Sequence, residues 1–357
     1  MSEELANAHK TGWLLFGATG VTGRLILKAA LSRGHRPVLA GRNLAALQAL
    51  AGPHGLDTVQ ASAEDRLALG RALSGHRLVL NAAGPFAVTA SPLMEAALAA
   101  GIDYIDVNGE LGPLQQLLQL DAKARARGTV LVGGAGFGVA ATDGLAAQVS
   151  ERLGGAKRLR IAVAADSAFA SPAVAESTLA VLAGGGYEIE GLVLARSRLG
   201  RLRWRERLQD GGKLAFASAP LADLVAAARV TGAAEVVAGV PMPAAQARVL
   251  ATLSPIIPSL LKAGPIRRLM ARIGGHSGAA RENGTFTSRV WVEGERDGRR
   301  VLGRLEAGEG FALAAELAVL AVEALADARP TPGAYTPARA FGAKFIEKAS
   351  GVRITFD

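Results

Sequence analysis

Cysteine is absent from the 357-residue chain. This absence excludes disulfides, thiolate metal ligands and cysteine nucleophiles together, and it fits a reducing compartment. Any redox chemistry must therefore come from a bound cofactor. The histidines show no metal-ligand spacing, so no metal site is expected. They are His9, His35, His54, His76 and His276.

Aromatic residues make up only 4% of the chain, and no basic stretch carries the interleaved aromatics typical of nucleic-acid binding. No nucleic-acid partner is therefore expected. Forty Lys and Arg residues against 31 Asp and Glu residues give a formal net charge of +9. Two explanations are open: a compositional preference for arginine, or an anionic small-molecule substrate such as a carboxylate or a thioester.

Long apolar runs are also absent, since none reaches the roughly 20 residues that span a bilayer. The polar, acidic start, MSEELANAHK, is unlike a signal peptide, so we expect a soluble, cytoplasmic protein. The apolar and basic stretch 254–275 is interrupted by prolines. We expect a packed or dimer-interface helix there, with a substrate lid or a weak membrane or lipid contact as alternatives. His276 follows in a glycine-flanked loop and is expected to be structural or exposed, the alternative being that it reaches the substrate cleft.

The first 135 residues alternate short apolar runs with helical stretches, which is the pattern of a parallel α/β sheet with right-handed crossovers. Six strands are predicted, at Trp13–Phe16, Pro37–Ala40, Thr58–Ala61, Leu78–Ala82, Tyr104–Val107 and Val130–Val132. Five helices are predicted between them, at Gly23–Ser32, Leu44–Ala51, Arg66–Leu73, Pro92–Ala99 and Leu114–Arg127. The sequence thus predicts a Rossmann-type, doubly wound parallel sheet.

The rest of the chain has a different pattern. Arg158–Ala164 alternates like a strand, and two alternating segments around Asp297-Gly298 predict a hairpin. Phe311–Ala328 is predicted as a long helix with an apolar face. A homodimer is expected, and each chain should have three parts. These are a dinucleotide-binding domain at 1–135, an α+β substrate and dimerisation domain with a mainly antiparallel sheet at 136–310, and a helix and tail at 311–357 that return to the first domain.

Gly17, Gly20 and Gly23 are spaced as a dinucleotide fingerprint, directly after the first strand and at the start of a helix. Gly17 permits the tight turn, Gly20 lets the backbone approach a diphosphate, and Gly23 lets the helix press against the sheet. The helix N-terminus offers amide donors to the phosphates. The predicted phosphate site also includes Thr19, Val21 and Thr22.

The second strand runs into Gly41-Arg42-Asn43, where an NAD-type site usually carries an acidic residue for the ribose 2′-hydroxyl. Arg42 and Asn43 favour the 2′-phosphate of NADP(H) over NAD(H), the alternative being a solvated loop start. Ser62 follows the third strand, beside the expected adenine. The segment after the fourth strand should run beneath the ribose and nicotinamide. It comprises Asn81, Ala82, Ala83, Gly84, Pro85 and Phe86.

In IDYIDVNGE, strand alternation places Tyr104, Asp106 and Asn108 on one face, with Glu110 beyond the strand end. These four residues are the candidate catalytic groups near a nicotinamide, with Tyr104 as a proton donor. The alternative is that they hold the loop through hydrogen bonds to its backbone. No tyrosine has a lysine four positions later, which argues against a short-chain dehydrogenase mechanism.

Six stretches resemble the saccharopine dehydrogenase-like family of NADP-binding oxidoreductases, in the branch that includes the trans-acting enoyl reductases. They are GATGVTGRLI, AGRN, NAAGPF, AALAAGIDYIDVNGE, GAGFGVAATDGLAA and TPGAYTPARAFG. The resemblance implies a Rossmann domain, a second α/β domain, NADP(H) binding and often dimerisation, with diverse substrates.

The chain departs from the family pattern at two places. Relatives often carry an acidic residue near the position of Ser62, and a GFDxxPxD pattern where this chain has residues 136–143. Gly138 and Ala141 replace the Asp and the Pro of that pattern. Asp143 is retained, and we expect it to cap the helix that follows.

These observations favour an NADPH-dependent oxidoreductase that reduces a C=C or C=N bond of a small carboxylate or acyl-type substrate, bound between the two domains. The enoyl version follows from the family branch and the imine version from the founding members, and the sequence leaves both open. The alternative is a non-catalytic NADP(H)-binding redox sensor or regulatory protein, because polar side chains near the expected nicotinamide are few.

Overall fold

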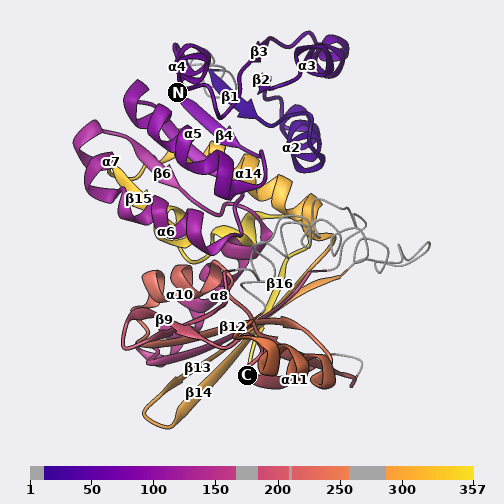
Figure 1. Ribbon diagram of the computed structural model, residues 1–357, viewed down its shortest axis with the longest axis vertical. Helices are drawn as coiled ribbons and strands as arrows, with labels where there is room; N and C mark the ends of the chain where they lie inside the picture. Colours follow the sequence, from indigo (N-terminus) through magenta and orange to yellow (C-terminus); the bar gives the residue numbers. More distant parts are fainter. Residues whose placement is uncertain (1–11, 166–183, 209–210, 257–286) are drawn as a thin grey trace. The chain divides into compact units, whose positions relative to one another are not determined.

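The computed structural model describes residues 12–165, 184–208, 211–256 and 287–357. The chain divides into two compact units (Figure 1). Unit 1 comprises Met1–Ala140 and Phe311–Ser350, and unit 2 comprises Ala141–Gly310 and Gly351–Asp357. Most of the stretch 254–275, from residue 257 onward, lies outside the described residues, as does His276.

Unit 1 is built on a seven-stranded sheet with the order β15-β6-β5-β4-β1-β2-β3, in which every neighbouring pair is parallel. The strands are β1 (Trp13–Phe16), β2 (Val38–Gly41), β3 (Thr58–Gln60), β4 (Leu78–Asn81), β5 (Asp103–Asp106), β6 (Val130–Val132) and β15 (Gly333–Tyr335). The predicted doubly wound sheet is confirmed, with all six expected strands. The strand order reverses between β1 and β4, which creates the switch point where such sheets bind ligands.

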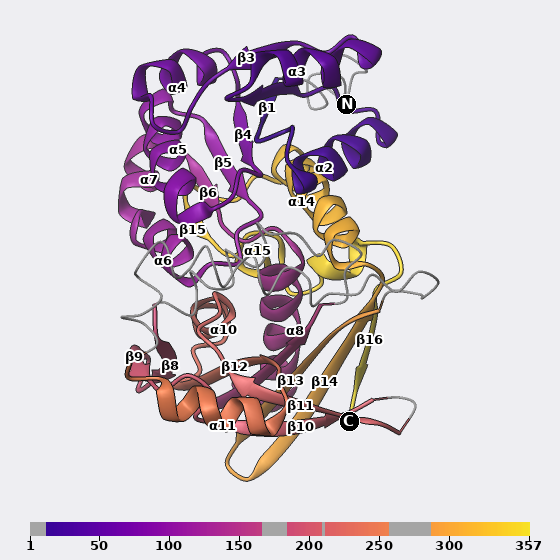
Figure 2. The ribbon, with the colours of Figure 1, turned by 45° about the vertical axis from the view of Figure 1, so that its right-hand side comes forward.

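Helices cover both faces of this sheet. They are α2 (Val21–Ser32), α3 (Leu44–Ala51), α4 (Arg66–Leu73), α5 (Phe86–Ala100), α6 (Leu111–Gln119), α7 (Asp121–Arg127), α14 (Gly310–Asp327) and α15 (Pro337–Phe341). Short 3₁₀ turns are found at Gly52–His54 and Phe345–Lys348. Helices α4, α5, α6 and α7 lie on one side of the sheet, whereas α2 and α14 lie side by side on the other (Figures 1 and 2).

Two of the predicted helices differ from the structure. Helix α5 begins at Phe86 and carries Pro92 in its interior, although the sequence predicted a start at Pro92. An internal proline removes one backbone hydrogen bond and disfavours a helix, but α5 continues through Pro92. Ala90, Leu93 and Met94 are buried around it. The predicted helix at 114–127 is two helices, because the chain is no longer helical at Leu120, where α6 ends and α7 begins.

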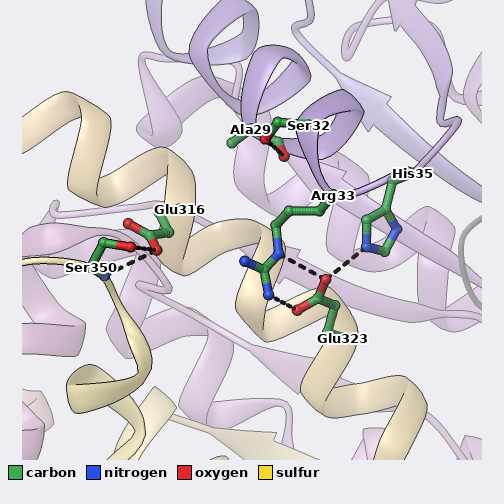
Figure 3. Close-up of polar contacts among 7 residues, drawn as sticks. All are labelled: Ala29, Ser32, Arg33, His35, Glu316, Glu323 and Ser350. Carbon is green, nitrogen blue, oxygen red and sulfur yellow. Dashed lines mark hydrogen bonds and ion pairs between the residues drawn. The ribbon is translucent and has the colours of Figure 1, made fainter.

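A cluster of three charged or titratable side chains connects α14 to the segment between α2 and β2 (Figure 3). Arg33 donates to both carboxylate oxygens of Glu323, from Nε at 2.9 Å and from Nη2 at 2.6 Å. His35 Nε2 lies 3.0 Å from Glu323 Oε1, and its buried ring packs edge-on against Trp13. Burial of the Glu323 carboxyl opposes its ionisation, but the hydrogen bonds from Arg33 and His35 keep its pKa below the ordinary value.

Unit 2 contains a second sheet, with the order β10-β11-β12-β7-β13-β14-β16 and with the β8–β9 hairpin attached to β12. Its strands are β7 (Arg158–Ala164), β8 (Gly186–Glu190), β9 (Val193–Ser197), β10 (Arg203–Arg207), β11 (Lys213–Ser218), β12 (Glu235–Pro241), β13 (Ser288–Arg296), β14 (Arg299–Ala307) and β16 (Arg353–Phe356). All pairs are antiparallel except β7 with β12. The predicted second, mainly antiparallel domain is therefore confirmed.

The hairpin of β13 and β14 turns at the predicted position. Asp297 and Gly298 both have positive φ angles, 51° and 80°, which suits the right-handed twist of the flanking strands. Helices α8 (Phe137–Leu153), α10 (Asp223–Thr231) and α11 (Ala244–Leu253) complete the described part of the unit. On one face of the sheet, Trp204 stacks on Phe216, whose ring meets Trp291 edge-on.

Two expectations about the ends of unit 2 need correction. Asp143 does not cap a helix, because α8 already begins at Phe137 and the Asp143 side chain is buried in its second turn. The tail does not return entirely to the first unit, because Arg353–Phe356 forms β16 and pairs with β14. Arg152 of α8 lies 3.4 Å from the centre of the Phe356 ring, which anchors this last strand to unit 2.

Candidate functional site

The glycine turn between β1 and α2 lies at the switch point. Gly17 has φ +85°, a conformation that favours glycine, and its amide donates to the Ala40 carbonyl at 2.8 Å. A Cβ at Gly17 would lie 2.7 Å from the backbone nitrogen of Ala83. The turn therefore packs directly against the loop that follows β4.

The first turn of α2 is open to a ligand. Gly20 is the N-cap residue and has no side chain to cap the helix, and among the described residues no side chain binds the first amides of α2. Gly20 and Val21 are exposed, whereas Thr19 and Thr22 are half-buried. Uncapped amides at a helix N-terminus and the positive end of the helix dipole suit a diphosphate.

The ends of β2 and β3 carry the residues predicted to meet the adenosine part. Arg42 is exposed, and its guanidinium makes no hydrogen bond or ion pair within the described ranges. Asn43 caps α3, because its Oδ1 accepts from the Ala46 amide at 3.1 Å. Ser62 is half-buried and accepts from the Glu64 amide at 3.3 Å. Among these residues, Arg42 has the side chain most available to a phosphate.

Asn81 at the end of β4 organises the next loop. Its Oδ1 accepts from the Ala83 amide at 3.0 Å, and its Nδ2 donates to the Tyr104 hydroxyl at 3.2 Å. Thr89 in the first turn of α5 donates to the Ala83 carbonyl. Ala83 is thus held by both of its backbone polar groups. The other residues of the predicted segment differ in their exposure to solvent. Ala82 is buried, Phe86 is half-buried, and Gly84 and Pro85 are exposed. A cis peptide bond joins Gly84 to Pro85.

Tyr104 and Asp106 form a buried pair at the end of β5, and both are almost fully inaccessible. The Tyr104 hydroxyl donates to Asp106 Oδ2 at 2.9 Å. Asp106 Oδ1 accepts from the amides of Asn108 and Gly134, at 3.0 and 2.7 Å. Burial raises the pKa of Asp106 to about 6, although these three hydrogen bonds favour its charged form. Burial and the neighbouring Asp106 raise the pKa of Tyr104 well above its ordinary value.

Asn108 and Glu110 bind backbone groups. Asn108 Oδ1 accepts from the Glu110 amide at 2.6 Å, and Asn108 Nδ2 donates to the Glu110 carbonyl at 3.1 Å. The Glu110 carboxylate accepts from the first amides of α5, those of Phe86 at 3.0 Å and Ala87 at 2.9 Å. The structure therefore brings the four candidate catalytic residues into one hydrogen-bonded network with Asn81.

Two members of this network were missed by the sequence analysis. Thr89 binds the Ala83 carbonyl, and the Gly134 amide binds Asp106. A hydroxyl in the first turn of a helix is a known backbone-binding pattern, which was overlooked because the helix was predicted to begin later. The glycine cluster in GGAGFG indicated a tight turn after β6, but not its acidic partner. Within the described ranges, no group of three or more acidic or histidine residues is suited to a metal ion.

An all-parallel sheet with a switch point, a glycine turn and an uncapped helix N-terminus defines a dinucleotide-binding Rossmann domain. Residues 13–132 match the family described as the saccharopine dehydrogenase NADP binding domain. The predicted resemblance is thus confirmed for this part of the chain, and the cofactor of the domain is NADP(H).

Curated relatives match over a limited part of their length. A probable mitochondrial saccharopine dehydrogenase-like oxidoreductase of Arabidopsis thaliana is 28% identical over 141 residues, 35% of this chain and 31% of the relative. A trans-acting enoyl reductase of Mycobacterium tuberculosis is 34% identical over 105 residues, 28% of this chain and 25% of the relative. The matched segments therefore span about a third or less of these proteins.

A similarity in fold extends over nearly the whole chain. Apo saccharopine dehydrogenase (L-Glu forming) from Saccharomyces cerevisiae superimposes with a TM-score of 0.64 at 13% identity, covering 97% of this chain and 99% of that one. The two-unit architecture is therefore the saccharopine dehydrogenase fold. No helix of the described residues is long and apolar enough to cross a membrane.

Proposed function

We propose that the protein is an NADPH-dependent reductase that acts on a C=C or C=N bond of a small carboxylate or acyl-type substrate. The observation that carries the proposal is the switch point of an NADP-binding domain, with an uncapped α2 and an exposed Arg42 beside it. The names of the relatives, an oxidoreductase and an enoyl reductase, support the reaction class. The proposal includes a homodimer, as the family resemblance implies, and a cytoplasmic location, as the sequence pattern predicts.

NADPH supplies a hydride when it is bound. In the proposed mechanism the amides of the first turn of α2 hold its diphosphate, and Arg42 holds its 2′-phosphate. The pair of Tyr104 and Asp106 supplies the proton that the reduced substrate takes up, with Tyr104 as the donor. Asp106 can exchange a proton near pH 6, because its pKa is about 6, and its Oδ2 accepts a hydrogen bond from the Tyr104 hydroxyl. Asn108 and Glu110 receive no chemical step, since both side chains bind backbone groups.

The Arg42→Ala variant tests the cofactor assignment. We expect it to weaken NADPH binding by about 1–3 kcal/mol, the scale for losing a charge-assisted contact, and to leave NADH binding nearly unchanged. Titration of cofactor fluorescence measures both affinities. Equal losses for the two cofactors would refute a contact with the 2′-phosphate.

The reaction class is tested by following NADPH oxidation with a panel of enoyl-CoA thioesters, imines and keto acids. We expect turnover of an enoyl or imine substrate, and a loss of about 100-fold or more in kcat in the Tyr104→Phe variant, since positioned acid catalysis contributes on that scale. Arg127→Gln, a surface change in α7, serves as the control and should leave kcat unchanged. Turnover that survives in Tyr104→Phe would remove this tyrosine from the mechanism.

A non-catalytic NADP(H) sensor is the second candidate function. It is favoured by the network itself, in which the hydroxyl of Tyr104 and the carboxylate of Asp106 are buried and bonded to other protein groups. Tight NADPH binding with no turnover across the whole panel would overturn the reductase and support the sensor.

A further inference from the structure

Two helix N-termini face the switch point, and they differ in what they bind. Helix α2 follows β1, and no side chain in the described part of the chain binds its first amides. Helix α5 follows β4, and its first two amides donate to the two carboxylate oxygens of Glu110. A helix N-terminus carries partial positive charge and amide donors, so each of the two would attract the phosphates of a dinucleotide. In this chain, one of the two sites already holds an anion.

The Glu110 carboxylate is held firmly in this position. The Asn108 side chain accepts from the Glu110 amide and donates to the Glu110 carbonyl, which fixes the backbone on either side of its Cα. The Asn108 amide is bound in turn by Asp106. The carboxylate therefore reaches α5 from a loop whose own conformation is determined by the end of β5.

The start of α5 is connected to the glycine turn. Thr89 in the first turn of α5 donates to the Ala83 carbonyl, and the backbone of Ala83 packs against Gly17. A displacement of the first turn of α5 would therefore move the loop that lies directly beside the diphosphate site.

We propose that Glu110 is a positioning residue for the cofactor. It fills the anion site of α5, so that the diphosphate of NADP(H) binds at α2 alone, and it holds Ala83 against the glycine turn. The inference depends on NADP(H) binding and is independent of which bond the protein reduces.

The Glu110→Ala variant tests this inference. We expect NADPH affinity to fall by roughly 10-fold or more, on the scale of lost charge-assisted hydrogen bonds. Acetate in excess should restore the affinity, because a small carboxylate can occupy the vacated helix end. The wild type and the exposed-site control Glu151→Ala should not respond to acetate. Cofactor fluorescence measures the affinity, and the assay needs no substrate.

The Glu110→Gln variant provides a second test that keeps the side chain in place. Its amide has one acceptor oxygen and no charge, so NADPH binding should weaken, and acetate should not restore it, because the side chain still fills the space. Unchanged NADPH affinity in Glu110→Ala, or a loss that acetate fails to reverse, would overturn the proposal.

Discussion

The Gly23→Ala variant is expected to bind NADPH about 100-fold or more weakly. Its free energy of unfolding should fall by about 1–3 kcal/mol, the usual cost of forcing an extra methyl group into a packed site. A Cβ at this position would lie 2.2 Å from the Gly17 carbonyl oxygen and 2.8 Å from the Ala18 Cα. Both are backbone atoms of the glycine turn and cannot rotate away. The added methyl must therefore displace α2 from the turn. Urea unfolding and NADPH fluorescence measure the two effects.

Gly70→Ala is the matched control for this variant. Gly70 lies in the interior of α4, and a Cβ there would meet no heavy atom within 4 Å. Alanine should raise the free energy of unfolding by about 0.5–1 kcal/mol, through its better helix propensity, and leave NADPH affinity unchanged. A loss of stability in Gly23→Ala no larger than a few tenths of a kcal/mol would show that α2 tolerates the displacement.

The Asp106→Asn variant is expected to remove a pH dependence of stability. Asp106 has a pKa of about 6 in the folded protein against an ordinary value of 3.8, so the folded state binds more protons than the unfolded state between these values. The contribution of Asp106 to the free energy of unfolding is fully present below about pH 4 and is lost as the pH rises through 6. At 1.36 kcal/mol per pKa unit, the loss amounts to roughly 3 kcal/mol. Asparagine never ionises, so the variant should gain stability relative to the wild type by about this amount from pH 4 to pH 8.

The difference between the two unfolding profiles isolates Asp106. The carboxyl groups with lowered pKa values contribute stability that appears with rising pH, which opposes the contribution of Asp106 in the wild type. They are Glu323, Glu295, Asp297 and Asp357. These groups are the same in both proteins and cancel in the difference. The oxygen of the introduced asparagine can still accept from the amides of Gly134 and Asn108. Parallel stability profiles from pH 4 to pH 8 would show that Asp106 does not titrate in this range.

Much of the fold could be predicted because its signals are local. The strands of the first sheet are short apolar runs with turn residues on both sides, and Asp297-Gly298 specifies its hairpin through the conformations that these two residues adopt. The elements that could not be predicted depend on distant partners. Strand β15 has three residues and pairs with β6 from far earlier in the chain, and β16 is specified by its pairing with β14. Likewise, α5 begins early because Glu110 caps it from 24 residues away.

In the candidate site, too, the features with local sequence signals could be predicted, whereas those that depend on strand pairing could not. Spacing alone predicted the glycine turn, and strand alternation correctly grouped Tyr104 with Asp106. The partners of these two residues are Asn81, at the end of β4, and Gly134, in the turn after β6, and both of these strands are neighbours of β5. A single sequence does not specify which strands become neighbours in a parallel sheet, so the network could not be assembled from it. The roles of the site residues in catalysis stay predictions.

The contacts of Arg33 and His35 with Glu323 join segments that are far apart in the sequence, and this separation has a consequence for folding during synthesis. His35 and Glu323 are 288 positions apart, and all of unit 2 except its last segment, Gly351–Asp357, is translated between the two halves of unit 1. Until α14 and β15 leave the ribosome, the face that buries Trp13 and His35 is uncovered and β6 is an unpaired sheet edge. The Rossmann domain is therefore completed only after most of unit 2 has been synthesised. During synthesis its aggregation-prone edge is exposed for longer than that of a contiguous domain.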